Sequence, residues 1–248
     1  MPDFMTTSQN RRLAYYQTEG QGPGVVFLGG FRSDMEGTKA LALEEWAQAN
    51  GRAFLRFDYS GHGASDGVFE DGAIGDWLED ARDIITELTQ GPQVLVGSSM
   101  GGWISLLLCR EMAARVAGLV TIAAAPDFTE DGYWASFSPE IKHKLESEGQ
   151  IAIPSEYGDP MIITRRLINE GRNRLVLRDP LPLPFPVRFL QGTADDAVPV
   201  EWAYRLLEHA QGDDMRLTVV KGADHRFSDP ICLEAVETAL DEVLQLLA

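Results

Sequence analysis

Short apolar runs alternate along most of the chain with longer stretches of helical periodicity, and this alternation limits the fold more than any other feature. Six brief apolar runs are expected to be strands, at 24–28, 53–57, 94–96, 119–122, 187–190 and 217–220. The stretches between them predict helices at about 37–50, 75–90, 100–113, 199–210 and 230–247. Such alternation is typical of an α/β fold with a mostly parallel central sheet flanked by helices. The opening segment, which ends at Gly20, instead predicts an antiparallel hairpin at one sheet edge.

One interval, from Pro126 to Pro186, breaks the alternation because it contains no convincing buried strand. Apparent helices lie near 138–149 and 159–171, and the interval ends in a proline-rich run. A stretch of about sixty residues is too long for a plain loop in a compact domain. The sequence therefore predicts a helical cap over residues 127–185, inserted after the sixth strand, on a core formed by 1–126 and 186–248.

The composition excludes some kinds of binding partner and indicates the cellular compartment. The 248 residues carry a formal net charge of −17, which repels phosphate backbones, so nucleic-acid binding is disfavoured. Cys109 and Cys232 both lie in apolar helical patterns, which excludes a disulfide scaffold and fits a reducing compartment. Residues 1–4 lack the start of a signal peptide, and no apolar window is long enough to span a membrane. We therefore expect a cytoplasmic protein without stable membrane insertion.

The most specific local signal is Gly97-Ser98-Ser99-Met100-Gly101-Gly102, which follows a strand and precedes an apolar helix. This is the G-x-S-x-G pattern of a nucleophile elbow, whose sharp turn requires small residues two places before and two places after the serine. A glycine-rich turn of this kind can also bind phosphate or simply pack tightly. In the elbow interpretation, Ser99 stands at the carboxyl edge of the sheet, on a helix N-terminus that favours developing negative charge.

A nucleophilic serine needs a base that accepts its proton and a carboxylate that orients the base. Among the four histidines, His225 fits this role best, because its loop follows the strand 217–220 and reaches the same sheet edge as Ser99. His143 and His209 lie in polar helical stretches, where solvated side chains are the ordinary outcome.

The acid should lie in another loop at this edge, and Asp195 and Asp196 both follow the strand 187–190. We choose Asp195, because Asp196 is one step nearer the next helix and would serve its N-terminus. Asp224 is a weaker candidate, since adjacent loop residues such as Asp224 and His225 rarely aim their side chains at each other.

An oxyanion hole needs two donors. The backbone N–H groups of Met100, after the nucleophile, and of Phe31, in the glycine-rich turn after the strand 24–28, are the candidates. The chain shows no metal-ligand spacing, no G-x-G-x-x-G that opens a helix after a strand, and no Walker lysine. We expect neither a metal nor a cofactor.

At these residues the chain resembles the α/β-hydrolase superfamily, and across nearly its whole length it is similar to a branch described as acting on palmitoyl-protein thioesters and acyl glucuronides. The blocks that carry the resemblance are Gly37-Thr38-Lys39-Ala40, Arg56-Phe57-Asp58-Tyr59-Ser60-Gly61, Val94-Leu95-Val96-Gly97-Ser98-Ser99, Gly101-Gly102-Trp103, Asp195-Asp196-Ala197-Val198-Pro199 and Asp224-His225-Arg226. The resemblance places the family's triad on Ser99, Asp195 and His225. It implies a serine hydrolase that cleaves acyl thioesters or activated carboxylic esters through an acyl-enzyme.

Other functions remain open at this point. A general carboxylesterase or lactonase would use the same triad, and a non-catalytic binding protein would keep the hydrolase fold without the reaction. The expected partner is a small-molecule or acylated-protein ester or thioester, and the expected assembly is a monomer or a dimer.

Residues of the cap and one loop arginine are the candidates for binding substrate. Trp134, Ile151 and Met161 would either line an acyl pocket or pack beneath the cap. Arg165 and Arg166 belong to an arginine-rich stretch that would either pair with acidic neighbours or hold an anionic substrate group, and Arg32 lies in the same turn as Phe31.

Overall fold

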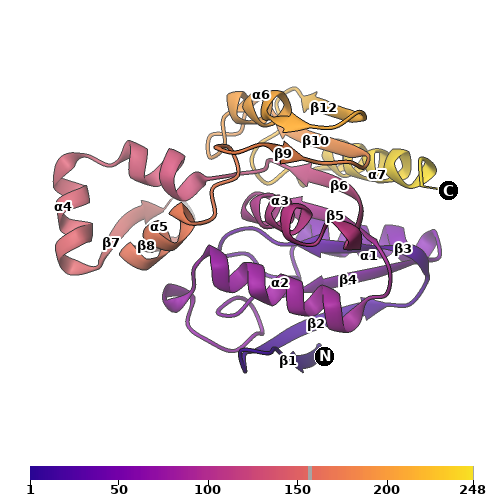
Figure 1. Cartoon of the computed structure of the whole chain (residues 1–248), viewed down its shortest axis with the longest axis horizontal. Helices are drawn as coiled ribbons and strands as arrows, with labels where there is room; N and C mark the ends of the chain where they lie inside the picture. The colour runs from indigo at the N-terminus through magenta and orange to yellow at the C-terminus, as the bar shows by residue number, and fades with distance from the viewer. Residues whose placement is uncertain (156–157, 248) are drawn as a thin grey trace.

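An eight-stranded sheet forms the centre of the computed structural model, which describes residues 1–155 and 158–247 (Figure 1). Its strand order is β1-β2-β4-β3-β5-β6-β10-β12. The bounds are β1 Asp3–Thr6, β2 Arg12–Thr18, β3 Gln21–Leu28, β4 Arg52–Phe57, β5 Gln93–Ser98, β6 Val116–Ile122, β10 Val187–Gly192 and β12 Met215–Val220. β1 and β2 pair antiparallel at one edge, β2 is antiparallel to β4, and the other neighbours are parallel. The predicted mostly parallel sheet is confirmed, as is the antiparallel edge.

Helices cover both faces of the sheet (Figure 1). α1 (Thr38–Ala49) and α7 (Pro230–Gln245) pack on one face, whereas α2 (Ile74–Leu88), α3 (Met100–Glu111) and α6 (Val200–His209) pack on the other. Alternate residues of each strand point to opposite faces, so Val25 and Phe27 of β3 join the α1–α7 side while Val26 and Leu28 join the α2–α3 side. Two apolar clusters, one on each face, therefore hold the sheet in place.

Most of the segment between β6 and β10, at residues 139–172, projects from the sheet at the left of Figure 1. The segment contains a π-helix at Phe128–Trp134, α4 (Pro139–Glu148), β7 (Gln150–Ser155), β8 (Gly158–Thr164), α5 (Arg165–Arg172) and β9 (Leu181–Pro182). We call residues 127–185 the cap, keeping the predicted bounds. β9 pairs with β11 (Ala210–Gln211), and two short 3₁₀ helices lie elsewhere, at Phe69–Asp71 and Ala113–Arg115.

The prediction of a helix over 159–171 was wrong in its first half. β8 occupies residues 158–164 and pairs antiparallel with β7, so that Ile151 lies opposite Ile163 and both side chains are buried. α5 begins only at Arg165, where the Thr164 hydroxyl accepts the N–H of Leu167 at 3.0 Å. Burying the isoleucines between the paired strands outweighs a local helical pattern. In the part of the chain that the structure describes, no helix is long and apolar enough to cross a membrane.

Candidate active site

Ser99 occupies the turn between β5 and α3, at the carboxyl end of the parallel strands. Its backbone adopts φ 54° and ψ −116°, a strained conformation in which non-glycine residues are uncommon. The glycines on either side are required by close approach. A Cβ on Gly97 would lie 2.4 Å from the carbonyl oxygen of Gly101, and a Cβ on Gly101 would lie 2.1 Å from that of Leu28. This is the geometry that the G-x-S-x-G pattern predicts for a nucleophile elbow.

A chain of hydrogen bonds connects Ser99 to His225 and Asp195. The Nε2 of His225 lies 3.1 Å from the Oγ of Ser99, and its Nδ1 lies 2.8 Å from the Oδ2 of Asp195. A carboxylate only accepts, so Nδ1 carries the proton and Nε2 is left to accept from the serine hydroxyl. The structure thus brings together the three residues predicted as a triad, from loops that follow β5, β10 and β12.

Asp195 is held in place by four donors. Its Oδ1 accepts the N–H of Ala197 at 2.9 Å and of Val198 at 2.8 Å, while Oδ2 accepts the amide Nε2 of Gln191 at 2.9 Å in addition to His225. Burial raises the pKa of Asp195, but the hydrogen bond and charge of His225, with the bonds from Val198 and Gln191, bring that pKa below its ordinary value. Asp195 is therefore a fixed, ionised partner for the imidazole.

The two rejected acid candidates lie elsewhere. Asp196 is exposed to solvent, next to the buried Asp195. Asp224 uses its Oδ1 to accept the N–H of Phe227 at 3.1 Å, which stabilises the loop that carries His225. The hydrogen bond to the imidazole comes from Asp195.

The two candidate oxyanion donors flank Ser99. Met100 is the first residue of α3, so its N–H has no acceptor within the helix. Phe31 belongs to the turn after β3, and this turn lies against the serine, since a Cβ on Gly30 would come within 3.4 Å of the Cβ of Ser99. Both N–H groups thus belong to segments that border the nucleophile.

An apolar cavity of about 790 Å³ opens onto the serine and histidine. Its volume is within the range of sites that bind small molecules. Aromatic and aliphatic side chains dominate its lining, which includes Phe31, Phe128, Tyr133, Met161, Val198 and Trp202. Such walls suit an apolar acyl chain better than a polar substrate group.

The candidate substrate-binding residues separate into two groups. Met161 and Arg32 line the apolar cavity. Trp134, Ile151, Arg165 and Arg166 are not among the described residues that line it.

The four residues outside the cavity lining contact other parts of the protein. Ile151 pairs with Ile163, and the guanidinium of Arg172 lies 4.4 Å from the ring centroid of Trp134.

The two cap arginines also have partners within the protein. Arg166 forms an ion pair with Asp76 of α2, and Arg165 donates to the carbonyl oxygen of Glu146. The arrangement therefore favours the pairing of these arginines within the protein over the binding of an anionic substrate group.

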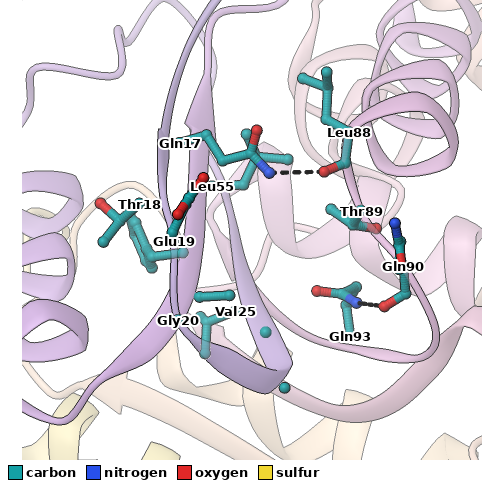
Figure 2. A pocket seen from close by; sticks show the side chains of 14 residues that line it. Gln17, Thr18, Glu19, Gly20, Val25, Leu55, Leu88, Thr89, Gln90 and Gln93 are labelled. Atoms are coloured by element: carbon teal, nitrogen blue, oxygen red, sulfur yellow. Dashed lines mark hydrogen bonds between the residues drawn. The ribbon is translucent and has the colours of Figure 1, made fainter.

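Another cavity, of about 460 Å³, lies at the amino ends of β3, β4 and β5, opposite the serine (Figure 2). Figure 2 shows Gln17 reaching across it to donate to the carbonyl oxygen of Leu88, at 2.8 Å. Its other walls combine glycines, glutamines, threonines and apolar residues of β3 and β4, and Glu19 is the acid among the described residues that line it. No serine, cysteine or histidine is among the described residues that line this cavity, so we place the candidate active site at Ser99.

Several residues at this site were not predicted from the sequence. Gln191 holds the acid, and Trp202 lines the cavity from α6. Their positions gave a weak signal, since Gln191 is a polar residue at the end of a buried strand, directly before the loop that carries Asp195. Lys39 belongs to a block noted in the sequence, but nothing there indicated that it approaches the loop of His225.

The fold and this site define a hydrolase of the α/β type. The α/β hydrolase family model matches residues 25–239, and the chain belongs to that family. It is 34% identical over 247 residues to human palmitoyl-protein thioesterase ABHD10, mitochondrial, with 99% of this chain and 80% of the relative covered.

Solved structures agree with this assignment. The structure of mouse α/β hydrolase domain-containing protein 10 superposes with a TM-score of 0.93 at 32% identity and covers all of both chains. A crystal structure from Agrobacterium vitis S4 matches with a TM-score of 0.94 at 39% identity, over 98% of each chain. The names of the curated relatives place those proteins in the mitochondrion, so they lend no support to the cytoplasmic location expected for this chain.

Proposed function

We propose that this chain is a serine hydrolase that cleaves acyl thioesters, and activated carboxylic esters of similar shape, through an acyl-enzyme. The observation that carries the proposal is the Ser99–His225–Asp195 chain of hydrogen bonds at the mouth of an apolar cavity. The relatives named as palmitoyl-protein thioesterases support a thioester with an apolar acyl group as the substrate.

In this proposal each group has one step. The Oγ of Ser99 attacks the acyl carbon while His225 Nε2 takes the hydroxyl proton, and Asp195 stabilises the imidazolium that forms. The negative charge that develops on the carbonyl oxygen is stabilised by the N–H groups of Met100 and Phe31. His225 then donates its proton to the departing sulfur or oxygen. A water molecule next gives a proton to His225 Nε2 and attacks the acyl carbon, the bond to Ser99 Oγ breaks, and that proton returns to Oγ as the carboxylic acid leaves.

The test is a comparison of kcat/KM for acyl thioesters of increasing chain length and for oxygen esters with the same acyl groups. The proposal predicts that thioesters are hydrolysed, that activity rises with chain length while the chain still fits the cavity, and that Ser99→Ala abolishes it. Oxygen esters or lactones hydrolysed in place of thioesters would identify a general esterase or lactonase. A protein that hydrolyses none of them, and that a fluorophosphonate does not label at Ser99, would be a binding protein with a hydrolase fold.

A further inference from the structure

A second, smaller cavity of about 180 Å³ also reaches the reacting groups. Phe31, Ser33, Ser99, His225 and Arg226 line both cavities. The serine and histidine therefore stand where the two cavities meet. An ester has two sides, the acyl group and the leaving group, and each requires its own space next to the nucleophile.

Lys39, the second residue of α1, lines the smaller cavity. Its Nζ donates to the carbonyl oxygen of Arg226, the residue directly after His225. An ammonium has three N–H donors, so this bond leaves two for other acceptors in the cavity. Lys39 is thus a cation held close to the catalytic base by a residue 187 positions away in the sequence.

The charged side chains that line the two cavities are mostly cationic, and the carboxylate of Asp195 lies outside this lining, on the Nδ1 side of His225. Among the described residues that line the two cavities, Arg32, Lys39 and Arg226 are cations and Asp34 is the acid, whereas the chain carries −17. The Oδ1 of Asp34 already accepts the N–H of Glu36 at 2.9 Å. A local excess of positive charge attracts anionic groups and disfavours cationic ones.

On the basis of the proposed thioesterase function, we propose that the smaller cavity receives the leaving group, and that Lys39 determines specificity by binding a carboxylate on that group. The apolar acyl chain occupies the large cavity, which leaves the small one for the thiol side of the substrate. When the tetrahedral intermediate collapses, the C–S bond breaks, its electron pair stays on sulfur, and the proton on His225 Nε2 passes to that sulfur. The small volume restricts the carboxylate to within a few bonds of the departing atom.

The protonation of Lys39 adds a pH dependence. Burial lowers the pKa of Lys39 to about 8, Asp224 and Cys232 oppose that change, and Arg226 reinforces it. The ammonium is therefore mostly charged at neutral pH and loses its proton as the pH rises through about 8. The preference for a carboxylate should weaken over the same range. An arginine in this position would stay charged throughout.

The experiment compares two octanoyl thioesters of nearly equal size, one of mercaptopropionate and one of mercaptopropionamide, which differ in the charge of the leaving group. The ratio of their kcat/KM values isolates that charge, because a change that affects both substrates alike cancels in the ratio. The variants are Lys39→Met, which removes the charge, and Lys39→Arg, which keeps it. Lys144→Met is the control, since it removes an equal charge from an exposed residue of α4 that pairs with Glu148.

We expect the ratio of anionic to neutral substrate to fall by about tenfold or more in Lys39→Met, and to be unchanged in Lys144→Met. In the wild type the ratio should fall as the pH rises through about 8, and in Lys39→Arg it should not. An equal loss for both thioesters in Lys39→Met would mean that Lys39 only positions the loop of His225, and would overturn the inference. A ratio that is the same in Lys39→Met as in the wild type would also overturn the inference. A wild type that hydrolyses neither thioester would overturn the proposed function and the inference together.

Discussion

Replacing Asp195 by asparagine tests whether this carboxylate sets the tautomer of His225. The Oδ1 of Asp195 accepts two backbone N–H groups, at 2.9 and 2.8 Å, so the carbonyl oxygen of an asparagine would keep that position. Its NH₂ group would then replace Oδ2, which lies 2.8 Å from His225 Nδ1. Two donors cannot share a hydrogen bond, so Nδ1 would have to accept and the imidazole proton would move to Nε2. That nitrogen could no longer accept the proton of Ser99.

The size of the loss follows from this change of tautomer. Removing the base function while keeping the oxyanion hole should lower kcat/KM by roughly 10³–10⁴-fold, or about 4–5 kcal/mol of transition-state stabilisation. The assay is the hydrolysis of an octanoyl thioester at neutral pH, with circular dichroism to show that the variant is folded. Asp196→Asn is the matched control, because it makes the same chemical change at the exposed neighbour and should leave the rate nearly unchanged. A loss smaller than about tenfold in Asp195→Asn, or an equal loss in Asp196→Asn, would refute the assignment.

Three further predictions concern the elbow, the buried His62 and the cap. Gly101→Ala should abolish labelling of Ser99 by a fluorophosphonate and lower Tm, because the new Cβ would lie 2.1 Å from the carbonyl oxygen of Leu28; normal labelling would contradict the proposed turn. His62 is 3% exposed and lies among aromatic rings, and burial lowers its pKa from 6.5 to about 4. Below pH 6.5 the unfolded chain therefore binds a proton on this histidine more readily than the folded chain does. The free energy of unfolding should fall by about 2 kcal/mol between pH 7 and pH 5. Urea denaturation of His62→Phe should show this part of the acid sensitivity removed, and an unchanged pH slope would count against it. Asp127→Ala should lower the free energy of unfolding by about 3 kcal/mol in the same assay, because it leaves the buried N–H groups of Val176 and Leu177 without their acceptor; a loss below about 1 kcal/mol would show that the loop repacks.

The sheet and its helices could be predicted because each repeats one local pattern. The apolar run at 24–28 became β3, and the helical stretch that starts near residue 230 became α7. The β7–β8 hairpin could not be predicted in this way. Pro154, Gly158 and Pro160 interrupt its alternation, and its isoleucines are buried only because the two strands meet. The hydrophobic periodicity of a sequence indicates one helix or strand at a time, whereas the pairing of two strands depends on both of them.

The residues of the candidate site also differ in whether the sequence could predict their positions. Ser99, Asp195 and His225 each follow a strand, so chain order and sheet topology were enough to predict that they meet, and the structure brings their side chains together. The partners of the cap arginines depend on tertiary packing, as in the ion pair of Arg166 with Asp76 of α2. Lys39 reaches the carbonyl of Arg226 only because α1 and the start of α7 pack on the same face of the sheet.

Covalent labelling shows directly whether Ser99 is an activated nucleophile. The protein is treated with a fluorophosphonate at neutral pH, digested, and its modified peptide sequenced by mass spectrometry. We expect one adduct per chain on Ser99, competition by an octanoyl thioester, and no adduct in Ser99→Ala. A protein that remains unlabelled, or that carries the adduct on another residue, would contradict this role of Ser99.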